Sequence, residues 1–217
     1  MRVISALPGQ TLRSLALSSL IAFIFIIVAA SALCQQAPIQ LPKQQMSGGM
    51  PLMQALAQRQ TSRAFADKPL PMQTLSNLLW AAFGVNRSRD VKAELGRTAP
   101  SAMNKQEIAL YVVLADGAYV YEAEQNKLRP VVAGDVRAKV AQGASAHAAV
   151  TIIYVADAKL DYAQVDAGFI GQNVYLFAAS EGVNAWFYAL HGADVASALK
   201  LPEGQKALYG QSVGYRP

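Results

Sequence analysis

The segment of residues 166–180 constrains the fold most, because it has helical spacing and apolar side chains on most of its faces. Phe169, Ile170, Val174 and Phe177 point to different sides of such a helix. A helix that is apolar all round is buried, either in a domain core or between subunits. We therefore expect this segment either at the centre of the domain or at a subunit interface.

The rest of the chain predicts several short elements and no internal repeat. Strands are expected at residues 108–115, 119–121, 128–132, 149–155, 185–190 and 207–214, and further helices at residues 52–59, 71–83, 135–141 and 194–200. Asp116-Gly117 is typical of a hairpin turn. A hydrophobic fraction of 53% with only 15% charged residues excludes a disordered chain. This order predicts an α+β domain with a mostly antiparallel sheet flanked by helices.

The N-terminus has the pattern of a secretory signal peptide. Arginines precede residues 15–32, which carry no charge and end in a small-x-small sequence. We expect residues 1–32 to be cleaved and the protein to be exported to the periplasm. Alternatively, residues 15–32 remain as a membrane anchor, since about 18 apolar residues just span a bilayer, or Cys34 is lipidated.

Domain boundaries follow from composition. Residues 33–49 contain prolines, glutamines and a final Ser-Gly-Gly, which is typical of a flexible linker. The folded domain is therefore expected at residues 50–217.

Several functions are excluded by what the sequence lacks. One cysteine and two isolated histidines give no basis for a disulfide framework or a metal site. The chain has no glycine-rich phosphate loop, and its Gly-x-Ser-x-Gly sequence at residues 210–214 falls within an expected strand, not at a strand-to-helix turn. The net charge of +5 comes without a basic run, so binding to nucleic acid is not indicated.

Two polar clusters stand out. The first, residues 59–65, contains Arg59, Thr61 and Arg63, whose guanidinium and hydroxyl donors can bind a phosphate and a polyol chain. The alternative is a solvated helix end, where positive charge suits the helix dipole. The second, residues 97–106, offers amide and hydroxyl groups to a flat heterocycle. By itself it also reads as a simple polar loop.

Together the two clusters resemble motifs of the FMN-dependent nitroreductase family, over residues 50–215. Arg59, Thr61, Arg63 and Phe65 match its Arg-x-Ser/Thr-x-Arg/Lys-x-Phe motif. A second motif, Pro-Ser-x-x-Asn-x-Gln, is matched by residues 100–106. The helix at residues 166–180 and the closing strand follow in the family's order. The closer likeness is to its SagB/ThcOx-type branch.

The resemblance implies a homodimeric α+β sandwich with two FMN sites at the dimer interface. Arg59, Thr61 and Arg63 would bind the FMN phosphate and ribityl chain. The flavin would be lined from the partner chain by Pro100, Ser101, Met103, Asn104 and Gln106. A backbone N–H at the strand end formed by Tyr188, Ala189 and Leu190 would face flavin N5. Relatives usually show a glycine directly after this turn and this chain does not, so the N–H donor would be shifted by one residue. Many relatives also have a longer basic tail; here Arg216 either binds the phosphate alone or is a free end.

The activity implied is that of an FMN-dependent oxidoreductase. A hydride or electron pair would pass between flavin N5 and a small aromatic, quinone-like or heterocyclic substrate in a ping-pong cycle. The alternatives are an azoline-type dehydrogenase, a non-catalytic flavin-binding module and a cofactor-free interaction domain. Export also predicts an electron donor other than the cytoplasmic NADH and NADPH.

Overall fold

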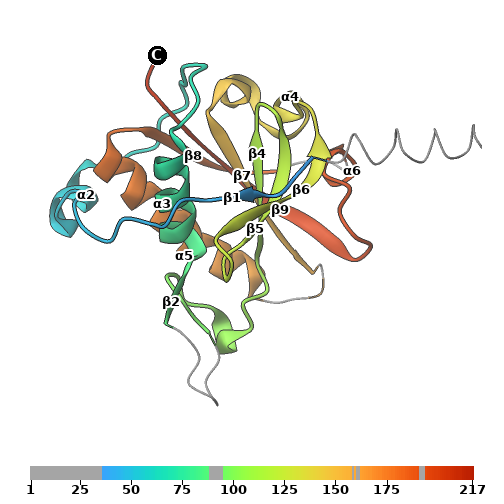
Figure 1. The fold of residues 1–217 in the computed structure, drawn as a ribbon, viewed down its shortest axis with the longest axis horizontal. Helices are drawn as coiled ribbons and strands as arrows, with labels where there is room; N and C mark the ends of the chain where they lie inside the picture. Colours follow the sequence, from blue (N-terminus) through green and yellow to red (C-terminus); the bar gives the residue numbers. More distant parts are fainter. Residues whose placement is uncertain (1–35, 88–94, 158, 160–161, 191–193) are drawn as a thin grey trace, which may run out of the picture. The chain divides into compact units, whose positions relative to one another are not determined.

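The computed structural model describes residues 36–87, 95–157, 159, 162–190 and 194–217. A seven-stranded antiparallel sheet has the order β1-β6-β5-β4-β7-β9-β8 (Figure 1). Its strands are β1 (Ile39–Gln40), β4 (Ala109–Leu114), β5 (Gly117–Glu122), β6 (Lys127–Ala133), β7 (Val150–Asp157), β8 (Asn184–Ala189) and β9 (Gln205–Gly214). A separate pair is formed by β2 (Val85–Arg87) and β3 (Gly96–Arg97). The predicted α+β fold is confirmed.

Helices cover both faces of the sheet (Figure 1). One face is covered by α3 (Met72–Phe83) and α5 (Ala163–Glu181), with α2 (Leu52–Gln58) packed against α5, and the other face by the short α4 (Arg137–Val140) and α6 (Asp194–Ala198). Single 3-10 turns are η1 (Ala102–Asn104) and η2 (Gly143–His147). The sheet is therefore the middle layer between two apolar cores.

The inner strand β7, between β4 and β9, contributes side chains to both cores. All of its residues except Asp157 are buried. Successive side chains of a strand point to opposite faces, so Ile152 and Tyr154 enter the core beneath α3 and α5, whereas Ile153 and Val155 enter the core beneath α4 and α6. The near-continuous apolar sequence of this strand reflects burial on both sides.

Helix α5 has one buried side and one open side. Its buried residues recur every three or four positions and include Ala167, Ile170 and Val174, so this stripe packs in the core of its own chain. Val165 and Phe169, on the open side, are 52% and 43% exposed. Within a single chain, therefore, only one side of this helix is buried as predicted.

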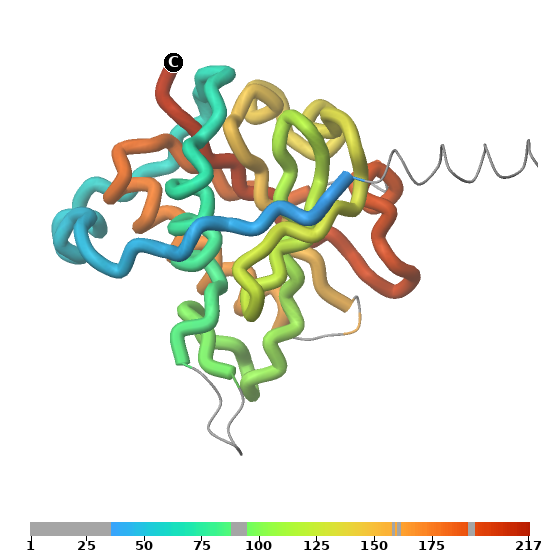
Figure 2. The backbone as a smooth tube through the Cα atoms, viewed as in Figure 1, coloured from blue at the N-terminus to red at the C-terminus, as the bar shows by residue number. Residues whose placement is uncertain are grey.

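The N-terminal residues 37–49 differ from the flexible linker expected from their composition. Strand β1 pairs with β6, and Leu41 is buried in the core. The Asn126 side chain donates to Pro42 O at 2.8 Å, and Gln73 Nε2 donates to Lys43 O at 2.9 Å. Figure 2 shows this segment, in blue, crossing the domain toward α2. Its backbone carbonyls find donors far away in the sequence, which composition does not reveal.

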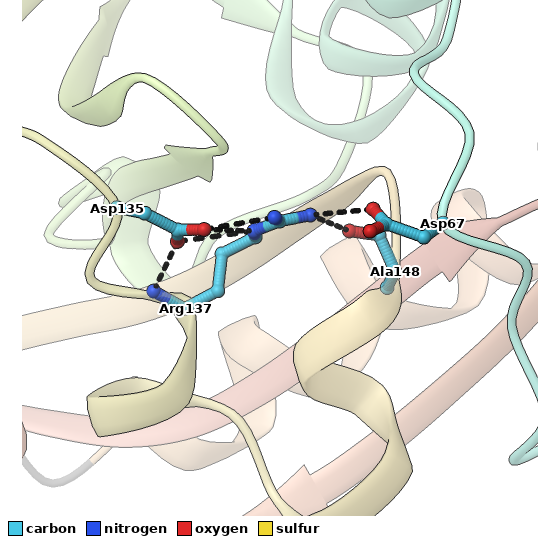
Figure 3. Close-up of polar contacts among 4 residues, drawn as sticks. All are labelled: Asp67, Asp135, Arg137 and Ala148. Carbon is cyan, nitrogen blue, oxygen red and sulfur yellow. Dashed lines mark hydrogen bonds and ion pairs between the residues drawn. The ribbon is translucent and has the colours of Figure 1, made fainter.

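Arg137 ties three loops together (Figure 3). Its guanidinium donates to Asp135 Oδ2 at 2.8 Å, to Asp67 Oδ1 at 3.3 Å and to Ala148 O at 3.4 Å. The hydrogen bond between Arg137 and Asp135 lowers the pKa of that carboxyl and raises the pKa of the guanidinium. The turn that leads into α3 is thereby fixed to the loop before β7.

Candidate functional site

The first polar cluster lies along the outer edge of β8, the last strand of the sheet. The Ser62 N–H donates to Ala185 O at 2.9 Å, and Asn184 Nδ2 donates to Ala64 O at 2.7 Å. None of residues 59–65 has a positive φ. The cluster is therefore held beside the strand by hydrogen bonds, with a relaxed backbone.

Tyr175 of α5 brings Arg59 and Thr61 together. Its hydroxyl lies 2.9 Å from Thr61 Oγ1 and accepts a hydrogen bond of 2.9 Å from the Phe187 N–H. The central carbon of the Arg59 guanidinium lies 5.4 Å from the centre of the Tyr175 ring, within cation–π range. Arg59 and Thr61, which are both predicted to bind phosphate, thus contact the same tyrosine.

Arg63 and Arg216 occupy different places around this site. The Arg63 guanidinium lies 5.2 Å from the centre of the Trp186 ring. Trp186 and Phe187 point to opposite faces of β8, so Arg63 lies across the strand from Tyr175. Arg216 lines a small hollow that it shares with Tyr175. The C-terminal cation is therefore close to the first cluster, whereas Arg63 approaches from the other face.

At the predicted strand end, Ala189 presents its N–H to the outside. N–H groups of an antiparallel edge strand point alternately to the partner strand and away from it. The Phe187 N–H points outward to Tyr175, so the Ala189 N–H lies on the same side. The Leu190 N–H faces β9, where Leu208 O accepts it at 3.5 Å, and Tyr188 is buried. The loop that follows, residues 191–193, lies outside the described residues.

The second polar cluster is a loop with strained backbone. Met103, Asn104 and Gln106 have φ values of 52°, 53° and 51°, in the left-handed region that non-glycine residues rarely adopt. Such conformations cost about 1–3 kcal/mol each and persist where the surroundings hold them, often at ligand-binding sites. Pro100, Met103 and Asn104 are exposed, and Met103 retains 71% of its accessible surface.

Gln106 braces this loop from within. Its Nε2 donates to Leu95 O at 2.6 Å and to Asn104 Oδ1 at 2.9 Å, while its Oε1 accepts from Arg97 Nε at 2.7 Å. Its backbone N–H donates to Ser101 Oγ at 2.7 Å. Burial lowers the pKa of Arg97. The polar groups of Gln106 thus hold the exposed part of the loop in place.

Asp166 fastens the same loop to α5. This carboxylate is fully buried, and its two oxygens lie 3.0 and 3.1 Å from the Ala102 nitrogen, whose N–H they accept. Asp166 also stands in the first turn of α5, where a negative charge suits the helix dipole. The second cluster is therefore attached to the beginning of the helix whose later part carries Tyr175.

Helix α5 separates the two clusters within one chain. Asp166 and Tyr175 are nine residues apart, which is about 13 Å along a helix axis and about half a turn around it. The second cluster thus leaves α5 on the opposite side from the first. This arrangement favours a binding site completed by two chains.

Neither Tyr175 nor Asp166 was predicted from the sequence as a site residue. Tyr175 belongs to an apolar run, and its partners Thr61 and Phe187 are distant or belong to the next strand. Asp166 resembles an ordinary carboxylate at a helix start. Both residues carry a polar side-chain atom in a helical segment whose other residues are almost all apolar, and this contrast is the signal that could have identified them.

Known proteins share this fold and much of this sequence. The sequence model of the Nitroreductase family matches residues 56–215. A nitroreductase homologue of Methanocaldococcus jannaschii is 28% identical over 174 residues, covering 70% of this chain and 85% of its own. The crystal structure of a nitroreductase homologue from Ralstonia eutropha has a TM-score of 0.74 and 31% identity, covering 84% of this chain and 90% of its own.

A more distant structure shares the fold alone. It is a nitroreductase with bound FMN from Bacteroides fragilis, with a TM-score of 0.53 and 17% identity over 77% of this chain and 89% of its own.

The fold and the two clusters define an α+β protein of the nitroreductase type. The chain belongs to the nitroreductase family, a family of oxidoreductases, and the predicted family is confirmed. The SagB/ThcOx-type branch stays a prediction. Among the described residues, no helix has both the length and the apolarity needed to cross a bilayer. The predicted signal segment, residues 1–32, and Cys34 lie outside them.

Proposed function

We propose that this protein is an FMN-dependent oxidoreductase that acts as a homodimer. The observation that carries the proposal is that Arg59, Thr61 and the outward N–H of Ala189 share the outer edge of β8. Ala189 is two residues beyond Phe187, about 7 Å along the strand. Cationic and hydroxyl donors thus precede a backbone donor along one line, which fits a ligand with a phosphate at one end and a flat ring at the other.

In this assignment the protein binds and orients its cofactor. Arg59 and Arg216 balance the charge of the phosphate, Arg63 approaches from the other face of β8, and Thr61 donates a hydrogen bond. The Ala189 N–H would donate to the flavin ring near N5. Bound FMN would supply transfer of a hydride or electron pair to a small aromatic, quinone-like or heterocyclic substrate in a ping-pong cycle.

A second chain would complete each site. Loop 100–106 of the partner subunit would lie over the flavin, which explains why the loop is rigid and exposed in its own chain. Exposed apolar side chains on two helices support the required interface: Leu52, Met53 and Leu56 on α2, and Val165 and Phe169 on α5.

The experiment that tests the proposal is the flavin spectrum of the purified protein. We expect a yellow protein with one FMN for each chain, and a flavin band that a donor bleaches and a substrate restores. A colourless protein that takes up no FMN contradicts the proposal. A yellow protein that no donor reduces favours the non-catalytic flavin-binding module. The alternative of an azoline-type dehydrogenase would be tested in the same assay, with an azoline-type compound added as the substrate to be oxidised.

We also propose that the protein acts outside the cytoplasm, where NADH and NADPH are scarce. The proposal is supported by the sequence pattern of residues 1–32. A membrane quinol, a redox protein or the substrate itself would then reduce the flavin. Rapid bleaching by micromolar NADH or NADPH in anaerobic stopped-flow mixing would contradict this choice of donor.

A further inference from the structure

We infer that Tyr175 is a positioning residue that directs the Thr61 hydroxyl toward a phosphate and thereby makes the site selective for phosphorylated flavin. The inference rests on the proposed function and assigns a role to a residue of α5 for which the sequence predicted none. Its basis is the set of contacts around the Tyr175 hydroxyl and ring.

The first step is the direction of the hydrogen bonds. The Tyr175 oxygen accepts from the Phe187 N–H, and a phenol has one hydrogen of its own to donate. Among the described residues, Thr61 Oγ1 at 2.9 Å is the other polar partner of this hydroxyl. Donation from Thr61 to Tyr175 would leave the hydrogen of the half-buried Tyr175 without a protein acceptor, whereas donation from Tyr175 leaves only the hydrogen of the exposed Thr61 free to meet water or a ligand, so we assign Tyr175 as the donor.

The second step is where the remaining hydrogen points. With its oxygen accepting from Tyr175, the Thr61 hydroxyl directs its own hydrogen away from the tyrosine. Thr61 is exposed, so this hydrogen faces the space in front of the site. An oxygen of a bound phosphate is a strong acceptor for it.

The third step is the ring of Tyr175. Its face holds the Arg59 guanidinium at 5.4 Å, and its side chain lines the hollow that Arg216 also lines. One tyrosine thus orders a cation through its ring and a hydroxyl through its oxygen. Loss of the hydroxyl alone should weaken the hold on phosphate while the ring keeps its packing and its contact with Arg59.

A purely structural role would give a different result. The Tyr175 hydroxyl also satisfies an outward N–H of an edge strand, which otherwise faces solvent. If that were its whole contribution, removal would loosen β8 and weaken every flavin alike. Selectivity between flavins with and without a phosphate separates the two roles.

The test is a double-mutant cycle on the apoprotein of the full chain, with FMN and riboflavin as probes in fluorescence titrations. The variants are Tyr175→Phe, Thr61→Val and the combination of both. Tyr209→Phe is the matched control, because Tyr209 packs against Phe187 from β9 at a ring distance of 4.9 Å. Tyr175 is only half-buried and the substitution keeps its ring, so the variant should fold, which melting temperatures verify.

We expect Tyr175→Phe to weaken FMN binding about five-fold, or about 1 kcal/mol. Riboflavin affinity should change by less than about two-fold, the usual error of additivity. In the Thr61→Val background, Tyr175→Phe should have no further effect on FMN. Tyr209→Phe should leave both affinities unchanged.

Three results would overturn the inference: equal losses for both flavins, additive losses in the cycle, or unchanged FMN affinity in Tyr175→Phe. Where riboflavin binds too weakly for titration, the cycle on FMN decides by itself. Failure of the unmodified apoprotein to bind FMN is a different outcome. That result overturns the proposed function.

Discussion

The two polar clusters differ in how their atoms are used. In residues 59–65 the backbone is relaxed, Thr61 and Arg63 are exposed, and Arg59 is half-buried over the Tyr175 ring. In residues 97–106 the backbone has three positive φ values, and Gln106 is hydrogen-bonded to Ser101 and Asn104 within the cluster, to Arg97 at its start and to Leu95 just before it. The first cluster is built to bind with its side chains, and the second is built to hold a shape.

This difference separates affinity from stability. Substitutions in the first cluster should change ligand binding and leave folding nearly unaltered, because exposed side chains contribute little to stability. Substitutions among the bracing residues of the second cluster should change folding as well.

The largest effect is expected from Phe169→Asp, which tests whether the two clusters need a second chain. A carboxylate at an apolar interface loses hydration without a partner and should cost several kcal/mol of association. We expect a monomer without flavin in sedimentation and absorbance measurements. Ala138→Asp on α4, also exposed but away from α5, is the control and should remain a flavin-loaded dimer. A flavin-loaded monomer in Phe169→Asp would contradict the two-chain site.

The next effect concerns the cations of the first cluster. Arg63→Ala and Arg59→Ala should each weaken FMN binding by about 1.5–3 kcal/mol, the scale of a hydrogen bond to a charged group. The melting temperature of the apoprotein should hardly change. Lys68→Ala is the matched control, since Lys68 also lies over an aromatic ring, that of Tyr215, at 4.4 Å. Full flavin content and unchanged affinity in Arg63→Ala would show that the phosphate binds elsewhere.

The bracing of the second cluster is tested by Asp166→Ala. The Ala102 N–H loses its acceptor, which should lower the free energy of unfolding by about 1–3 kcal/mol. Asp166→Asn keeps one acceptor oxygen and should recover part of this loss. Urea unfolding of the apoproteins measures the effect. If Asp166→Ala altered FMN affinity without altering stability, the second cluster would behave like the first and the comparison would fail.

The smallest effect concerns the backbone alone. At Met103, φ is 52°, and glycine avoids the cost of about 1–2 kcal/mol that other residues incur there. Met103→Gly should therefore be more stable than Met103→Ala. At Ser62, where φ is not positive, Ser62→Gly should be less stable than Ser62→Ala by about 0.5–1 kcal/mol. If the glycine variant were less stable than the alanine variant at Met103 as well as at Ser62, the loop would carry no backbone strain.

Much of the fold could be predicted from short-range patterns. The central strand, the hairpin after β4 and the helix ending at Gly182 follow from apolar runs, turn residues and a left-handed glycine with φ of 68°. The attachment of residues 37–49 could not be predicted. It depends on side chains such as Asn126 and Gln73, which are distant in sequence and carry no pattern of their own.

The positions of the residues of the candidate site were predictable to a similar extent. Motif spacing located both clusters and the strand end, because those residues are close together in the sequence. It did not show that Ala189, among its neighbours, presents the outward N–H, since that depends on the register of β8 with β9. Nor did it show that Tyr175 joins Arg59 to Thr61, because helix packing creates that contact.

The central claim is that each site combines the first cluster of one chain with the second cluster of its partner, and subunit mixing tests it most directly. One chain would carry Arg59→Ala and Thr61→Val, and the other Asn104→Gly, which removes the side chain but suits a φ of 53°. Each variant alone should bind FMN poorly. Mixed dimers, isolated through two different tags, should regain one of their two sites at normal affinity, because one site then combines two intact clusters. Mixed dimers that bind FMN no better than the parent variants would contradict the account.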